Sequence, residues 1–292
     1  MAQRGAADVS GIRPDLKRLS VRGGAISLAA QGVLFLLQMI SLIVLARLLA
    51  PGDFGLLAIA AFVTGFLAVF GDLGLGNAII QRRDLNDDQL SSLFWINLAA
   101  CFLLAVAAAA LSPLVARLFG QTALMPIILA LALTYPLAGA TVQHRAVLAR
   151  RMLYGRLKAI EIIAATGAIA TAIILAWKGF GYWALVAMML TRSTIALVLL
   201  WWASAWRPAA PRVAPGTGSL LRFGLELTGF NTLNYIARNA DDALIGWVWG
   251  PAILGFYNRA YALLTAPLQH LNQPLSSVTV ATLSRLNDEP EA

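Results

Sequence analysis

An arginine and two aspartates lie inside an otherwise apolar stretch of the sequence. The stretch reads YIARNADDALIGWVWG (235–250), and the charged residues are Arg238, Asp241 and Asp242. On a helix, residues three and four positions apart lie on one face, so either aspartate is close enough to pair with the arginine. An ionisable group at the centre of a bilayer costs about 2.5–3.5 kcal/mol on insertion scales, so it usually faces a partner or a watery cavity. Two interpretations remain open: a self-neutralising cluster that fixes helix packing, or the lining of a functional cavity.

The segment that follows, 255–282, is unusually polar. Its Arg259, His270 and Gln273 share one helical face. Arg192 is a further buried cation, and no carboxylate lies at helical spacing from it. Such an arginine is a suitable ligand for phosphate or pyrophosphate, although a carboxylate on another helix would fit equally well.

The composition indicates which elements must hold these residues. Of the 292 residues, 59% are hydrophobic and 12% are charged, against about 45–50% and about 25% in soluble domains. This balance predicts an all-α polytopic membrane protein. Eight apolar segments reach spanning length, at about 20 residues each. They are 24–46, 54–76, 91–112, 122–142, 160–177, 182–204, 222–249 and 255–282.

The loop charges predict the orientation of these spans. Arg47, Arg117 and Lys178 lie in loops on one side, whereas the other Lys and Arg residues of the loops and termini lie on the opposite side. The positive-inside rule therefore places the N-terminus and the C-terminus in the cytoplasm. Residues 1–23 are interpreted as a retained cytoplasmic arm rather than a signal peptide. The net charge of +8 is explained by topology and by attraction to anionic membrane lipids, and no nucleic-acid partner is expected.

The first two spans recur at an offset of 200 residues. Pro51 matches Pro251, and Gly55 matches Gly255. Polar residues also recur on one helical stripe, as Gln31, Gln38 and Ser41 in the first copy and Asn231, Arg238 and Asp241 in the second, with Asn234 filling the second stripe. A parallel repeat of this kind is typical of secondary transporters, whose sites lie near the midplane between the repeats.

The repeat predicts four regions along the chain. They are an N-terminal arm (1–23), a six-helix lobe (24–204), a cytoplasmic linker (205–219) and the first two helices of an incomplete second lobe (220–292). We expect the substrate cavity between the lobes, with a neutral to positive charge that suits an anionic ligand. The candidate residues are Gln38, Arg192, Asn231, Asn234, Arg238, Asp241, Asp242, Arg259, His270 and Gln273. No catalytic residue, metal or cofactor is expected.

Several stretches resemble the polysaccharide flippases of the multidrug/oligosaccharidyl-lipid/polysaccharide exporter superfamily. They are VLARLLAPGDFGLLAIA (44–60), GDLGLGNAIIQRR (71–83), ADDALIGWVWGPAILGFYNRAYALLTAP (240–267) and PLSSVTVATLSRLNDEPE (274–291). The resemblance implies a V-shaped transporter in the bacterial inner membrane that moves undecaprenyl-pyrophosphate-linked sugar units to the periplasmic leaflet. It also implies basic cavity residues that hold the pyrophosphate, and the polysaccharide polymerase and chain-length machinery as further partners. Members have twelve or more spans, so this chain departs from the family in stopping after eight.

Two other functions remain open. A cation-coupled multidrug exporter of the same superfamily would favour an acidic cavity without unpaired arginines. A membrane enzyme that transfers sugars to polyprenyl phosphates would need clustered acids on a cytoplasmic loop to hold Mg²⁺. The loop QRRDLNDDQL offers Asp84, Asp87 and Asp88, but it is short, and the acids are also explained as a solvated turn and helix cap.

Overall fold

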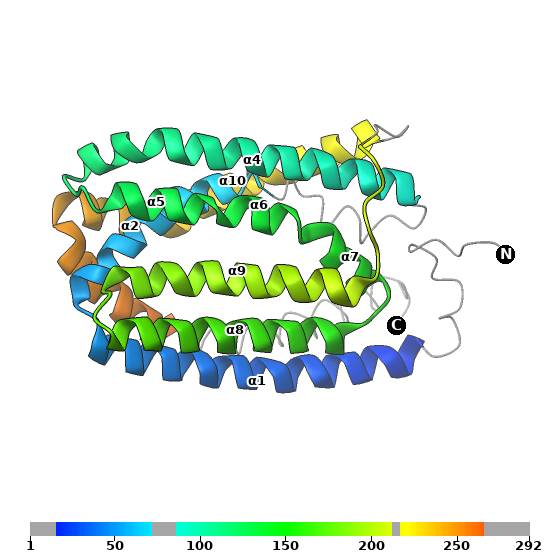
Figure 1. The fold of residues 1–292 in the computed structure, drawn as a ribbon, viewed down its shortest axis with the longest axis horizontal. Helices are drawn as coiled ribbons and strands as arrows, with labels where there is room; N and C mark the ends of the chain where they lie inside the picture. The colour runs from blue at the N-terminus through cyan, green and yellow to red at the C-terminus, as the bar shows by residue number, and fades with distance from the viewer. Residues whose placement is uncertain (1–15, 72–85, 212–216, 266–292) are drawn as a thin grey trace, which may run out of the picture.

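The computed structural model describes residues 16–71, 86–211 and 217–265, and these ranges contain helices and no strands. Figure 1 shows the helices running along one common direction as a bundle. The labelled helices are α1 (Leu16–Leu48), α2 (Pro51–Ala68), α4 (Asp87–Leu118), α5 (Leu124–Ala132), α6 (Thr134–Gly139), α7 (Val142–Arg150), α8 (Tyr154–Trp177), α9 (Tyr182–Ser204) and α10 (Thr217–Val248). A further helix covers 250–265.

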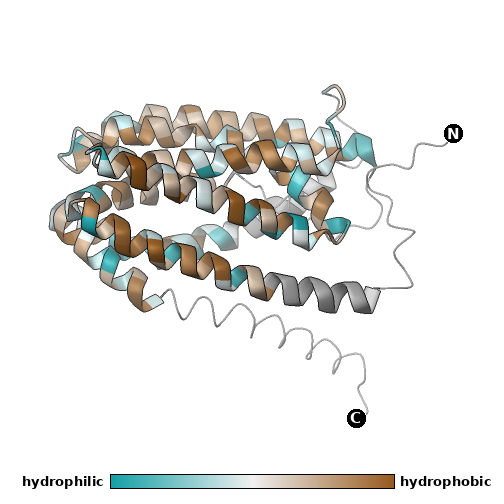
Figure 2. Cartoon of the chain, turned by 60° about the horizontal axis from the view of Figure 1, so that its bottom comes forward, coloured by the Kyte–Doolittle hydropathy of each residue, from teal (hydrophilic) through white to brown (hydrophobic). Residues whose placement is uncertain are grey.

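The polytopic all-α fold predicted from the composition is confirmed. Within the described ranges, six helical segments are long and apolar enough to cross a membrane: Leu28–Leu48, Pro51–Ala68, Asp87–Leu118, Leu124–Arg150, Tyr154–Trp177 and Tyr182–Ser204. They correspond to the first six predicted spans. The helix α10 and the helix 250–265 occupy the seventh and the start of the eighth. Figure 2 shows that apolar residues predominate along the helices of the bundle, as membrane-spanning helices require.

Several boundaries differ from the prediction. The helix α1 already begins at Leu16, so part of the predicted arm 1–23 is helical. The fourth span is broken into α5, α6 and α7. Pro136 contributes to this break because it lacks a backbone N–H and crowds the preceding turn. The hydroxyl of Tyr135, in α6, donates a 2.6 Å hydrogen bond to the carbonyl oxygen of Thr64 in α2, which fixes the broken span to its neighbour.

The first six spans pack into one lobe. The helix α8 lies between α1 and α9, α4 packs against α5 and α6, and α9 contacts α2, α6 and α7. Apolar residues of α2, α4, α5 and α9 form the largest buried cluster, which Leu254 of the helix 250–265 also joins. The helix α10 packs against α2 and α4. The core of the N-terminal lobe thus extends to the following helices, which pack against α2.

The two matched turns meet at one end of the bundle, where α1 leads into α2 and α10 leads into the helix 250–265 (left in Figure 1). We call this the turn end. A Cβ atom at Gly55 would overlap the carbonyl group of Pro251, and a Cβ atom at Gly255 would overlap that of Pro51. The contact is reciprocal at the 200-residue offset, as expected when two equivalent elements meet about a two-fold axis.

The segment after α9 is fixed at the other end of the bundle. The indole N–H of Trp95 donates to the carbonyl oxygen of Ala209 at 2.8 Å, and the Ala209 N–H donates to the hydroxyl of Ser91 at 3.0 Å. Trp206 is buried among apolar residues of α4 and α7. The first part of the predicted linker, 205–211, is thus held on the N-terminal lobe.

Candidate functional site

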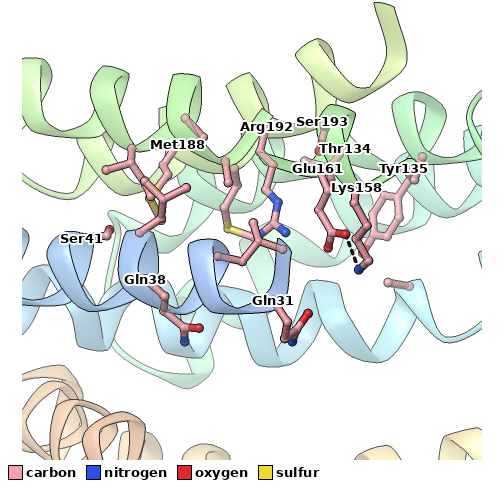
Figure 3. Close-up of a pocket in the computed structure, with 18 residues that line it drawn as sticks. Gln31, Gln38, Ser41, Thr134, Tyr135, Lys158, Glu161, Met188, Arg192 and Ser193 are labelled. Atoms are coloured by element: carbon pink, nitrogen blue, oxygen red, sulfur yellow. Dashed lines mark hydrogen bonds and ion pairs between the residues drawn. The ribbon is translucent and has the colours of Figure 1, made fainter. Parts of the chain in front are cut away.

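A cavity of about 750 Å³ lies among α1, α2, α6, α8 and α9. Figure 3 shows its polar side chains together with Met188. The lining residues with polar or charged side chains are Gln31, Gln38, Ser41, Thr134, Tyr135, Lys158, Glu161, Arg192 and Ser193. The remaining lining residues are Leu, Ile, Ala and Met. An apolar cavity with a few convergent polar groups is the usual form of a ligand site.

The charges of this cavity come from α8 and α9. The Nζ atom of Lys158 lies 2.8 Å from an Oε atom of Glu161, with both side chains about a quarter exposed. Arg192 is exposed in the structure, not buried as predicted. It projects from α9 toward α1 (Figure 3), and in the described part of the chain no carboxylate lies within ion-pair distance of it. Two cations against one anion give the lining a net charge of +1. The cavity can therefore attract an anionic group, with Arg192 as its available cation.

The wall opposite Arg192 is formed by the polar stripe of α1. Gln31, Gln38 and Ser41 are spaced by seven and three residues, which keeps them on one side of the helix. Their amide and hydroxyl groups can donate and accept hydrogen bonds, as recognition of sugar hydroxyls requires. The first-copy stripe predicted from the sequence thus lines a cavity together with Arg192.

The charged residues of α10 have different neighbours. Asp241 accepts a 2.6 Å hydrogen bond from the hydroxyl of Tyr257, and Asp242 accepts a 3.2 Å hydrogen bond from the side-chain amide of Asn258. Neither aspartate forms an ion pair with Arg238 in the parts of the chain that are described, although helical spacing permitted one. The two aspartates join α10 to the helix 250–265 instead. Arg238 is exposed.

The structure does not bring all candidate residues into one cavity. Gln38 and Arg192 line the cavity in the N-terminal lobe, whereas Arg238 and the two aspartates do not belong to its lining. Asn231 and Asn234 are exposed on α10 and likewise lie outside it. The polar stripes of the first and second copies therefore occupy separate surfaces in this structure.

The last candidates lie in or beyond the helix 250–265. The guanidinium carbon of Arg259 lies 3.2 Å from the centre of the Phe54 ring, at the start of α2. This cation–π contact places Arg259 beside the turn end, where it links the two matched elements. His270 and Gln273 lie outside the described residues.

Sequence reasoning did not find the contribution of α6 and α8 to the cavity. Glu161 and Lys158 look like interfacial residues in the sequence, but their position three residues apart is a usable signal for an ion pair. No polar stripe identified in the sequence includes Tyr135.

The sequence analysis also missed the fully buried His144. Its Nδ1 lies 2.9 Å from the Ser204 hydroxyl.

Comparison with known proteins identifies relatives over most of the chain. The family model described as "Polysaccharide biosynthesis protein" matches residues 44–292. The lipopolysaccharide biosynthesis protein WzxC of Escherichia coli is 25% identical over 282 residues, which cover 94% of this chain and 56% of the relative. The succinoglycan biosynthesis transport protein ExoT of Rhizobium meliloti is 26% identical over 258 residues, which cover 88% and 52%.

A third relative matches a shorter part of the chain. The teichuronic acid biosynthesis protein TuaB of Bacillus subtilis is 29% identical over 221 residues, covering 74% of this chain and 45% of TuaB. The chain thus spans about half the length of the curated relatives that it matches. No solved structure matches it.

Proposed function

Since the chain belongs to the polysaccharide biosynthesis protein family, we propose that it takes part in moving lipid-linked oligosaccharides across the bacterial inner membrane. The membership confirms the resemblance to polysaccharide flippases seen in the sequence motifs. The cargo in this proposal is an undecaprenyl-pyrophosphate-linked repeat unit, which passes from the cytoplasmic to the periplasmic leaflet. The transported repeat unit is then used in the synthesis of an exopolysaccharide or a lipopolysaccharide.

The observation that carries this proposal is Arg192 in the cavity of the N-terminal lobe. A pyrophosphate is a strong anion, and a guanidinium binds phosphate oxygens with two parallel hydrogen bonds. Arg192 has no carboxylate partner among the described residues, and the amides of Gln31 and Gln38 line the same cavity. The positive lining favours an anionic cargo over a cationic drug, so a multidrug exporter is the weaker candidate.

The relatives support transport rather than catalysis. The name of ExoT describes a transport protein, and the acids invoked for a sugar-transferring enzyme have a structural explanation here. Asp87 and Asp88 occupy the first turn of α4, where carboxylates interact favourably with the helix dipole. Asp84 lies outside the described residues. We infer that the chain is not an enzyme.

The orientation and the domains form part of the proposal. With the N-terminus in the cytoplasm, the turn end faces the periplasm. The reciprocal contact between the two turns would then close the periplasmic side between the lobe 24–204 and the two helices of 220–292. Lipid-linked oligosaccharide and membrane lipids are the expected partners, together with the polymerase and chain-length machinery that use the exported repeat units.

Deletion of the gene in the organism that encodes the chain tests this function. We expect lipid-linked repeat units to accumulate on the cytoplasmic leaflet, where an impermeant enzyme that oxidises or cleaves sugars cannot reach them in intact spheroplasts. Re-expression of the parent protein should restore access, whereas Arg192→Gln at equal membrane level should not. Unchanged surface access after deletion would contradict the proposal.

A further inference from the structure

A second hollow lies between α8 and α9, on the outside of the bundle. Its volume is about 470 Å³, within the range of about 300–1,000 Å³ that is usual for ligand sites. Ala159 and Ile163 of α8 and Leu199, Trp202 and Ala203 of α9 contribute to its walls. None of its lining residues lines the cavity that holds Arg192. The hollow is therefore a separate site, and we call it the α8/α9 groove.

The groove opens toward the surface that faces lipid. Trp202 is 81% exposed and Ile163 is 53% exposed in the isolated chain. Both belong to helices that are long and apolar enough to cross a membrane. Residues that line such an opening meet acyl chains rather than water.

One end of the groove carries a cation. Arg156 is the charged residue of its lining and is exposed. It lies in the first turn of α8, which begins at Tyr154. From Arg156 to Ile163 the helix rises by roughly 10 Å, so the cation and the apolar walls form one continuous site about two helical turns long.

The charged residues that lie close to Arg156 in the sequence are mostly positive. Arg150 and Arg151 end the preceding helix, and Arg207 follows α9. The acidic residue nearest in sequence on α8, Glu161, is already paired with Lys158. The acids Asp87 and Asp88 begin α4, whereas the helices that pack against α8 are α1, α7 and α9. Because Arg156 is the charged residue of the lining, the mouth of the groove complements an anion.

We propose that the α8/α9 groove binds an anionic phospholipid, with an acyl chain along its apolar walls and the phosphate held by Arg156. Basic pockets between transmembrane helices are known to hold anionic lipid head groups. A guanidinium holds a phosphate with two hydrogen bonds. The indole of Trp202 suits the boundary between head groups and acyl chains. This proposal concerns a site on the surface of the lobe and is independent of the cargo.

Native mass spectrometry of the purified 292-residue chain in detergent tests the site. Phosphatidylglycerol and phosphatidylcholine with identical acyl chains are added in turn, and retained lipid is counted. We expect phosphatidylglycerol to bind about five to ten times more tightly, because its head group has a net negative charge, whereas the choline ammonium of phosphatidylcholine offsets the charge of its phosphate. Inorganic phosphate in excess should not displace it, because free phosphate cannot use the apolar walls.

Three variants distinguish the contribution of the Arg156 charge to lipid binding from that of the apolar walls. Arg156→Gln should lower the retention of phosphatidylglycerol to that of phosphatidylcholine. Ala159→Trp should fill the groove and lower the retention of both lipids, and Ala159 is exposed, so the fold has room for the larger ring. Arg117→Gln removes an exposed arginine at the turn end and should behave like the parent protein.

Four results would overturn the proposal. They are equal retention of the two lipids by the parent protein, equal behaviour of Arg156→Gln and Arg117→Gln, displacement of the lipid by inorganic phosphate, and a lipid-free dimer that Ala159→Trp abolishes. The last result would assign the groove to a second copy of the chain. If Ala159→Trp does not fold, the comparison of Arg156→Gln with Arg117→Gln decides the question.

Discussion

Gly55 lies directly against the backbone carbonyl of Pro251, so closely that a Cβ atom at this position would overlap it. The same relationship recurs with the roles exchanged, between Gly255 and Pro51. Each proline lies in the first turn of its helix: Pro51 is the first residue of α2, and Pro251 is the second residue of the helix 250–265. Glycine is required at both positions because the two backbones cross there.

Gly55→Ala should therefore separate the two turns. The added methyl group cannot be accommodated without a backbone shift, and overpacking of this kind costs about 1–3 kcal/mol. We expect a cysteine at Leu254, which is fully buried in the parent protein, to react with an impermeant maleimide roughly ten times faster in the Gly55→Ala background.

Gly52→Ala is the matched control for this prediction. Gly52 lies in the same turn, but nothing lies within 4 Å of a Cβ atom built there. Labelling at Leu254→Cys should stay at the parent rate in this background. Equal rates in the Gly55→Ala and Gly52→Ala proteins would mean that the turn contact does not hold the two elements together. The native Cys101 is buried and is replaced by Ala to remove background.

The hydrogen bond between Tyr257 and Asp241 should couple α10 to the helix that follows. Its length of 2.6 Å is typical of a hydroxyl that donates to a carboxylate. A double-mutant cycle of Tyr257→Phe and Asp241→Asn, read by thermal unfolding in detergent, should give a coupling energy of about 0.5–1.7 kcal/mol. Tyr261→Phe changes a neighbouring exposed ring and should show no coupling to Asp241→Asn. Additive effects of Tyr257→Phe and Asp241→Asn would exclude a stabilising contact.

We expect His144 to contribute to the stability of the protein and not to its transport activity. Its ring is fully buried, with its centre 4.6 Å from that of Trp201 and 5.1 Å from that of Trp206. Ser204→Ala removes the group within hydrogen-bond distance of Nδ1, and leaving a buried polar atom unpaired costs about 1–3 kcal/mol. We expect a lower unfolding temperature and less protein in the membrane.

Transport per molecule of the Ser204→Ala protein should stay at the parent value. Arg145→Gln, at an exposed position next to His144, should leave both stability and transport unchanged. A Ser204→Ala protein of normal stability with impaired transport would instead assign His144 a functional role.

The sequence predicts the spans well because a membrane helix must be apolar along its length. The start of α9 at Tyr182 and its end at Ser204 agree with the predicted limits. The break near Pro136 was harder to foresee, since a proline in a membrane helix can bend the helix without ending it. The matched turns were also predictable, because Pro51, Gly55 and their equivalents recur at a fixed offset.

The partners of the charged residues could not be predicted in the same way. Spacing along α10 allowed Arg238 to pair with Asp241 or Asp242, but both aspartates bind residues sixteen positions away. Such contacts depend on how the next helix turns back, which helical periodicity does not encode. The cavity likewise combines residues from five helices, and the sequence indicated only the stripe on α1 and the unpaired Arg192.

The central claim is that the cavity beside Arg192 holds the pyrophosphate of a lipid-linked sugar. The most direct measurement is the binding of a polyprenyl-pyrophosphate-linked oligosaccharide to the purified protein, compared with binding of the same glycan on an uncharged polyprenyl ether. The parent protein should prefer the pyrophosphate form. In the Arg192→Gln protein, the ratio of affinities for the pyrophosphate and ether lipids should fall by about tenfold or more, as removal of a charged hydrogen-bonding partner implies. In the Arg117→Gln protein this ratio should equal that of the parent. Equal binding of the charged and uncharged lipids by the parent protein, or an unchanged preference in Arg192→Gln, would contradict the claim.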